Sequence, residues 1–258
     1  CLDYLRKWYL FGMAFGELLR DRPCVCLPDD HDVYHGNLWG AGGRRADGTG
    51  QRGQDSGGYT MPAAFVNMVQ RTQTSHLPHP YDPTPVEQNI GVYYCDMRYG
   101  GVSFALLEDR KFKSSPTVAV PRGRVVNGWF QNPDFDPARE ADVPGAELLG
   151  QRQLEFLREW AADWTGAWMK VVASQTLFST VATLPADATS DSVVPKLEIP
   201  VPGHYVRGDK LVADADSNGW PQTGRNDALR EIRRAFAFHI AGDQHLGTVT
   251  QYGIDAWR

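Results

Sequence analysis

Lysine and cysteine are both scarce in this sequence, and each shortage removes a class of protein from consideration. Only 6 of the 26 basic residues are Lys, and the 31 acidic residues give a formal net charge of -5. Binding to nucleic acid through a general basic field is therefore not expected, because phosphate neutralisation needs clustered Lys and Arg. The 4 Cys form no CxxC pair and no dense framework, so a disulfide-stapled scaffold is not expected either.

Long hydrophobic runs are missing as well. The most apolar stretches, residues 171–178 and 235–240, are far shorter than the ~18 apolar residues that a membrane-spanning helix needs. With 258 residues, 42% hydrophobic and 22% charged, the composition is that of an ordinary globular chain. A prior of roughly 150 residues per domain allows one large domain or two modest ones. The chain starts at Cys1 rather than Met, so we expect a fragment or a processed chain.

Helices and apolar strands alternate along the chain, which predicts an α/β or mixed sandwich architecture. Apolar residues at helical spacing mark the helices, and short apolar runs bounded by Pro, Gly or Asp mark the strands. Gly100-Gly101 between two of these strands is a hairpin signal. The expected helices are 2–19, 60–73, 149–164 and 225–234, and the expected strands are 24–27, 91–99, 102–108, 168–174 and 235–241.

Residues 36–60 form a Gly-rich stretch without an apolar period. We expect a long loop there, a candidate lid or substrate-facing insertion. Residues 48–53 formally match GxGxxG, but no strand is expected before them and no helix directly after, so a dinucleotide fingerprint is rejected. Cys24 and Cys26 alternate with Val25 and point to the same face of the expected strand, where we interpret them as two buried small hydrophobic residues.

Two of the expected buried strands end in clusters of Asp and His. Residues 29–32 (DDHD) follow the first strand, and residues 243–245 (DQH) follow the last. In open α/β sheets ligands bind beyond the carboxyl ends of the strands, so the two clusters can converge on one crevice. Asp and His, with Asn37 as a further oxygen donor, suit hard or borderline cations. The side chains of Asp243 and His245 share one side if that segment stays extended.

The competing interpretation of these clusters is a turn or a helix cap. It is the commoner explanation for a single Asp after a strand, but it accounts poorly for four consecutive ionisable residues. No protein nucleophile is visible, since the sequence has no GxSxG and no Cys in an identifiable activating setting. A metal-activated water is therefore the favoured nucleophile, and two metal ions ~3.5–4 Å apart would hold it for phosphoester hydrolysis.

Five ordered motifs spread over nearly the whole chain resemble the PhoD-like phosphatases, the alkaline phosphatase D group of the metallophosphoesterase superfamily. Residues 22–33 (RPCVCLPDDHDV) with Asn37 are similar to the family's DDH(D/E)…N segment. The other four motifs are 99–110 with Asp109 and Arg110, 149–175 ending at Gln175, 216–225 with Asp216, Trp220 and Arg225, and 242–245 (GDQH).

This resemblance implies a four-layer α-β-β-α sandwich, a single PhoD-like domain over residues 1–258, and hydrolysis of phosphate mono- or diesters at a multinuclear metal centre. The metals that it suggests are Ca and Fe. It implies that His31 donates a proton to the leaving oxygen or stabilises its charge, and that Asp32 orients His31. The implied metal ligands are Asp29, Asp30, Asn37, Asp243 and His245, and weaker matches that would bind substrate or support the ligands are Asp109, Arg110, Gln175, Asp216 and Arg225.

The family's first metal-binding motif, a Gly-Asp-x-x-Tyr element with its strands, is not found in this chain. We therefore expect a chain truncated at both ends, whose sandwich is incomplete because N-terminal strands are missing. The resemblance also implies export in bacteria and a small phosphate-ester substrate. Two alternatives stay open: a nuclease, and a non-catalytic module that keeps the fold and holds a carbohydrate or an anionic polymer.

Overall fold

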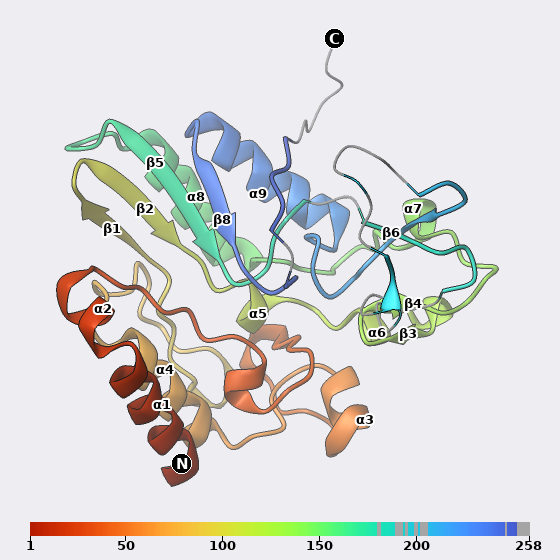
Figure 1. Cartoon of the computed structure of the whole chain (residues 1–258), viewed down its shortest axis with the longest axis horizontal. Coiled ribbons are helices and arrows are strands. Elements are labelled where there is room, and N and C mark those ends of the chain that lie inside the picture. The colour runs from red at the N-terminus through yellow and green to blue at the C-terminus, as the bar shows by residue number, and fades with distance from the viewer. Residues whose placement is uncertain are drawn as a thin grey trace.

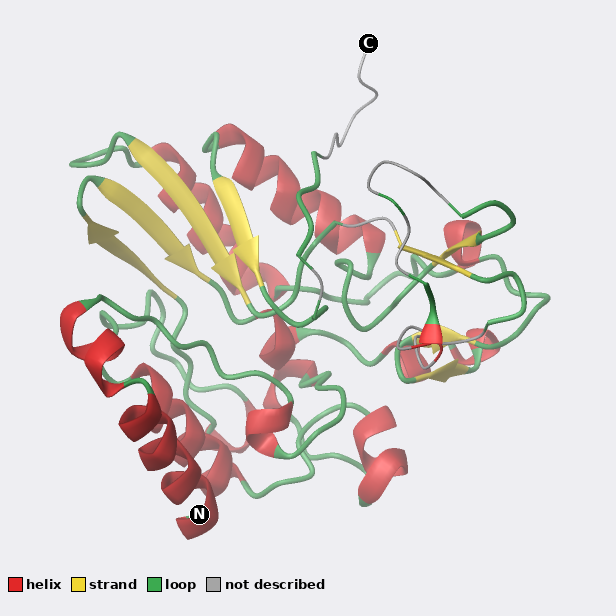
Figure 2. Cartoon of the chain, in the orientation of Figure 1, coloured by secondary structure: helices red, strands yellow, loops and turns green. Residues whose placement is uncertain are grey.

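A four-stranded sheet with the strand order β1–β2–β5–β8 lies at the centre of the structure (Figure 1). The structure is a computed structural model and describes residues 1–179, 182–188, 193, 196–198, 201, 206–245 and 247–251. Strand β1 (Cys95–Tyr99) runs antiparallel to β2 (Val102–Leu106). Strands β2, β5 (Met169–Ser174) and β8 (Phe238–Ala241) run parallel, so their carboxyl ends meet at one edge of the sheet (Figure 2).

The expected hairpin is confirmed. Gly100 and Gly101 join β1 to β2 with φ values of 58° and 80°, and Tyr99 pairs with Val102 across the turn. Two successive residues with positive φ are the requirement of the tight turn that matches strand twist, and glycine meets it without a steric penalty. The turn therefore sets the register of the strand that leads into the candidate site.

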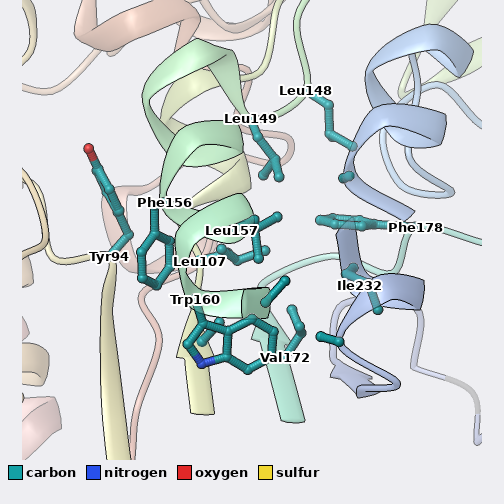
Figure 3. Close-up of a cluster of buried hydrophobic side chains, with 14 of the residues drawn as sticks. Tyr94, Leu107, Leu148, Leu149, Phe156, Leu157, Trp160, Val172, Phe178 and Ile232 are labelled. Atoms are coloured by element: carbon teal, nitrogen blue, oxygen red, sulfur yellow. The ribbon is translucent and has the colours of Figure 1, made fainter. Parts of the chain in front are cut away.

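Helices α8 (Gly150–Ala162) and α9 (Gln222–Arg234) cover one face of the sheet (Figure 1). Buried residues of α8 recur at helical spacing, with Phe156, Leu157 and Trp160 directed at the strands. They meet Val172 of β5 and Ile232 of α9 in the main hydrophobic cluster (Figure 3). This spacing of three and four residues is the signal that predicted the helix.

The opposite face of the sheet is apolar but only partly covered. Met97, Phe104, Val171 and Phe238 form one cross-strand row, and Phe238 is 56% exposed. The expectation of a buried last strand is therefore wrong, because β8 lies at the edge of the sheet that the described residues form, next to β5. The mixed α/β class is confirmed, and the described residues supply one helix layer and one sheet of the expected sandwich.

A second packing unit lies beside the sheet and is formed by the first part of the chain. Helix α1 (Leu2–Ala14) and helix α2 (Gly16–Asp21) match the expected helix, with a break at Phe15, and α4 (Ala63–Thr74) matches the next one. Their core gathers Tyr4, Val33, Leu38, Tyr59, Phe65, Val66, Val69 and Ile90. No helix among the described residues is long and apolar enough to cross a membrane.

Two expectations for this part of the chain are corrected. Residues 24–27 are not a strand, because a strand requires ladder hydrogen bonds and no described segment pairs with them. Residues 36–60, expected as a long loop, contain the short helix α3 (Gly50–Asp55) and bury Trp39 and Tyr59. Backbone bonds tie the stretch together, such as Gly58 N–H to the Trp39 carbonyl at 2.7 Å.

Short elements occupy the connections. Strands β3 and β4 form one two-stranded sheet, and β6 and β7 form another. The elements are α5 (Asp109–Phe112), α6 (Pro116–Ala119), α7 (Pro137–Glu140), β3 (Val125–Val126), β4 (Trp129–Phe130), β6 (Ala182–Leu184), β7 (Lys210–Val212) and the 3₁₀ turns η1 (His31–Val33), η2 (Ala41–Gly43), η3 (Glu87–Asn89) and η4 (Pro121–Gly123).

Candidate active site

The carboxyl ends of the three parallel strands deliver the candidate residues to one place. Asp109 and Arg110 begin α5 just after β2, Gln175 directly follows β5, and Asp243 comes two residues after β8. In Figure 1 the three strands point toward α5. Parallel strands share a carboxyl edge, and this edge is where α/β sheets bind ligands. Asp29 and Asp30 of the first expected cluster and Asp243 of the second approach Arg110 at this edge, although residues 24–27 before the first cluster are not a strand.

Arg110 occupies the middle of this site. Its side chain is fully buried, and its guanidinium faces four carboxylates from three separate segments. Nε donates to Asp29 Oδ1 at 2.8 Å and Nη1 donates to Asp216 Oδ1 at 2.6 Å. Nη2 donates to Asp243 and lies 3.8 Å from Asp30 Oδ2. We call Arg110 with these four aspartates the Arg110 cluster.

Negative charge exceeds positive charge within the Arg110 cluster, and burial makes that excess costly. Burial raises the pKa of Asp30 to about 6 and that of Asp243 to about 7, while the Arg110 guanidinium opposes both shifts. A buried ammonium adds some compensation, because Lys113 Nζ donates to the main-chain carbonyl of Asp216. Burial lowers the pKa of Lys113, in spite of Asp216 nearby.

Carboxylate oxygens are the donors that calcium and ferric ions take in proteins, so the chemistry of the cluster suits a metal. The arrangement of these carboxylates, however, does not suit a metal ion. Within the described ranges no group of three or more His, Cys, Asp or Glu side chains is placed to hold a metal ion. The guanidinium of Arg110 stands between the carboxylates instead. As arranged here, these residues form an arginine-centred cluster rather than a metal site.

Asp109 and Gln175 hold the ends of β2 and β5 together. The carboxylate of Asp109 accepts hydrogen bonds from the backbone N–H groups of Gln175 at 2.9 Å and Thr176 at 3.1 Å. Gln175 Oε1 accepts from the Arg110 backbone N–H at 3.1 Å, and Gln175 Nε2 donates to the carbonyl of Pro28. Both side chains therefore position the Arg110 cluster.

His31 and Asp32 do not form the expected pair. Both oxygens of Asp32 are engaged elsewhere: Oδ2 accepts from the Asp29 backbone N–H at 2.8 Å, and Oδ1 accepts from Gln73 Nε2 at 2.7 Å. Asp32 thus closes the turn of residues 29–32, while His31 is exposed and donates its backbone N–H to Asp30 Oδ1 at 2.7 Å. The local turn takes the carboxylate because a backbone N–H three residues away is an easier partner than a solvated ring.

Three more expected site residues have the following places in the structure. Asn37 is buried and donates its Nδ2 to Asn127 Oδ1 at 3.1 Å, and Arg225 on α9 packs against Gly219. His245 is exposed, and the segment carrying it is not extended, because Asp243 has φ 76° and His245 has φ 55°. The alternation that would put Asp243 and His245 on the same side therefore does not apply.

A sequence model of the PhoD-like phosphatases matches residues 7–257. The chain belongs to the PhoD-like phosphatase family. A solved structure of PhoD is similar in fold, with a TM-score of 0.51 and 18% sequence identity over 86% of this chain and 34% of the PhoD chain. This chain thus spans about a third of the length of that PhoD chain, and no curated protein matches it.

Sequence reasoning missed several residues that complete the site of this PhoD-like chain. Trp39 Nε1 donates to Asp216 Oδ1 at 2.7 Å, and Lys113 reaches the same residue's carbonyl. Asp214 accepts from the Asp216 backbone N–H and from Ser217 Oγ, each at 2.8 Å. The Asp-x-Asp spacing at 214 and 216 was a usable signal, and so was the run of charges directly after β2. Trp39 carries no local signal at all.

Proposed function

We propose that this chain forms part of an enzyme that hydrolyses phosphate esters. The observation that carries the proposal is the Arg110 cluster, in which Asp29, Asp30, Asp216 and Asp243 gather at the carboxyl edge of the sheet of a PhoD-like chain. Separate segments meet there at the cost of burying like charges. Such an arrangement is expected at a functional site rather than in a merely structural core.

His31 is the group best placed to exchange a proton with the substrate. It is exposed, and its backbone is fixed through Asp30 Oδ1 at the border of the cluster. A proton donor beside the leaving oxygen is what ester cleavage needs. The carboxylate of Asp32 holds the turn that presents His31, so it acts on the backbone rather than on the ring.

We include metal dependence in the proposal. It is supported by membership of the PhoD-like family, for which a metal centre is expected, and not by the arrangement of the Arg110 cluster. The small phosphate ester, either a monoester or a diester, is the proposed substrate class. The arrangement described here supplies no metal-based step, so the chain's own contribution is the positioning of His31 and of the carboxylates.

The test is hydrolysis of a chromogenic phosphomonoester and a chromogenic phosphodiester by the full gene product, together with its metal content by elemental mass spectrometry. His31→Ala and Asp243→Ala are expected to abolish turnover, whereas His79→Ala, at an exposed histidine outside the Arg110 cluster, is expected to keep it. Activity retained in both site variants contradicts the site assignment. A folded, metal-free and inactive full-length protein favours a non-catalytic module instead.

A further inference from the structure

Cys24 and Cys26 form a thiol pair that the proposed hydrolysis does not use. Their Sγ atoms lie 3.7 Å apart, and the two residues are separated in the chain by Val25 alone. The sequence reasoning placed them on the same side of the chain, which the contact bears out, but expected both to be buried. Cys24 is in fact exposed and Cys26 is half-buried.

We propose that Cys24 and Cys26 are an oxidisable dithiol that closes to an intramolecular disulfide. The co-substrate is a low-molecular-weight disulfide such as oxidised glutathione. The Cys24 thiolate attacks one sulfur of that disulfide, forms a mixed disulfide and releases one glutathione thiol. Cys26 then attacks the Cys24 sulfur, which forms the protein disulfide and releases the second glutathione thiol, so two protein thiols and one disulfide give one disulfide and two thiols.

Exposure and neighbourhood assign the order of these two steps. A thiol must be reached before it reacts, and Cys24 is the exposed member of the pair. Burial raises the pKa of the Cys26 thiol to about 11, so Cys26 suits the second, intramolecular step, where proximity replaces reactivity. Cys95 is buried in β1 and Cys1 lies at the start of α1, and neither has another cysteine in contact among the described residues.

The disulfide formed here is expected to be easily reduced. A disulfide bond joins its sulfurs at about 2.05 Å, so they must approach by roughly 1.7 Å from their present distance. Two residues separated by one intervening residue close a small ring, and strained, exposed disulfides are the labile ones. The pair is therefore suited to reversible modification rather than to permanent stapling of the fold.

The thiol pair lies on the segment that enters the Arg110 cluster. The carbonyl of Cys24 accepts a hydrogen bond from His76 Nε2 at 3.0 Å, which anchors the start of this segment. At its other end, the carbonyl of Pro28 accepts from Gln175, and Asp29 binds Arg110. Contraction between Cys24 and Cys26 pulls on these two anchors. Formation of the disulfide does not require the proposed hydrolysis. The disulfide would nevertheless lie on the segment that leads to the Arg110 cluster.

The test treats the folded protein with oxidised glutathione, blocks free thiols with iodoacetamide and maps each cysteine by mass spectrometry. The expected result is loss of alkylation at Cys24 and Cys26 together, with a mass lower by two hydrogens, while Cys95 reacts at least about tenfold more slowly. Dithiothreitol is expected to restore both thiols. A natural protein that stays alkylatable at both positions, or forms dimers linked through Cys24, overturns the proposal.

Two variants test the roles, with circular dichroism to confirm that each one folds. Cys26→Ser is expected to trap glutathione on Cys24, because the resolving thiol is gone. Cys24→Ser is expected to slow modification of Cys26, because the exposed thiol that reacts first is gone. Release of glutathione from Cys26→Ser, or unslowed modification of Cys26 in Cys24→Ser, contradicts the assigned order. All of these readouts are chemical, so they stand whether or not the protein hydrolyses phosphate esters.

Discussion

Arg110 and Asp216 are joined by a 2.6 Å hydrogen bond between Nη1 and Oδ1, although 106 residues separate them in the chain. The same Oδ1 accepts the indole N–H of Trp39 at 2.7 Å. Asp216 is 7% exposed, so its buried carboxylate depends on the guanidinium and the indole for these hydrogen bonds. Stability at this point of the molecule therefore depends on partners that the fold alone brings together.

Replacing the central arginine tests this dependence. Arg110→Met leaves four carboxylates without their cation, of which Asp30 and Asp216 are buried, and the loss of one partner of a buried ion pair costs about 3–5 kcal/mol. The free energy of unfolding in urea is expected to fall by at least that amount. Arg98→Met is the control, because its pair with Asp163 is exposed and such pairs contribute about 0–1 kcal/mol. Equal losses of unfolding free energy in the two variants would show that the Arg110 cluster contributes no more to stability than an exposed ion pair.

Trp39→Phe keeps an aromatic ring and removes one donor from Asp216. A hydrogen bond to a charged group contributes about 1.5–3 kcal/mol, so the unfolding free energy is expected to drop by that amount. Trp168→Phe serves as the control, since Trp168 is 73% exposed and its replacement is expected to be nearly neutral. A Trp39→Phe protein as stable as the control would mean that the indole N–H contributes nothing.

His35 gives the molecule an acid-sensitive point. Its Nε2 accepts the Thr60 backbone N–H at 3.1 Å, so the ring is neutral, and burial lowers the pKa of His35 to about 4. The folded state then binds fewer protons than the unfolded state, whose histidine has a pKa of about 6.5. The contribution is complete above pH 6.5 and is lost as the pH falls toward 4.

Between pH 7 and pH 5 this single group is expected to cost about 2 kcal/mol of unfolding free energy. Urea unfolding at the two pH values measures the loss. His35→Gln lacks the titrating ring and is expected to show a pH dependence smaller by that amount. Identical pH slopes in the variant and the natural protein would mean that His35 is not held neutral.

Two glycines are expected to respond to alanine with opposite signs. A Cβ at Gly40 would lie 2.5 Å from the carbonyl oxygen of Lys111, which is backbone of α5 and cannot swing away. Gly40→Ala is therefore expected to destabilise the protein by about 1–3 kcal/mol, as overpacking does. Gly12 lies inside the exposed helix α1 with no atom in the way, so Gly12→Ala is expected to stabilise by about 1 kcal/mol. Thermal unfolding of both variants checks the pair.

The sequence predicted those features that depend on residues close together in the chain. The turn at Gly100 and Gly101, the stripe of α8 and the Asp that follows β8 were all recognisable from the sequence. The strand expected at residues 24–27 failed because pairing needs a neighbour that no local pattern can supply. The burial expected for β8 failed for a related reason, since an apolar run does not say whether its strand is central or at an edge.

The central position of Arg110 could not be predicted from the sequence for a different reason. Arg110 was expected to have a supporting role, whereas it is the residue that every carboxylate of the cluster faces. Its hydrogen-bonded partners lie 81, 106 and 133 residues away, and charge alone does not tell which of 22 Asp will reach it. For Asp32 the expected role was too large. Its carboxylate accepts a hydrogen bond from the backbone N–H of Asp29 and does not orient the ring of His31.

The long reach of Arg110 also bears on how the molecule is made. During synthesis Arg110 is made before its partners Asp216 and Asp243, which follow more than a hundred residues later. Contacts of such sequence separation slow folding, because loop closure comes before any gain. Before Asp216 and Asp243 are synthesised, Asp29 and Asp30 are the carboxylates of the cluster that can offset the charge of Arg110. The cluster is therefore completed only after the final third of the chain has left the ribosome.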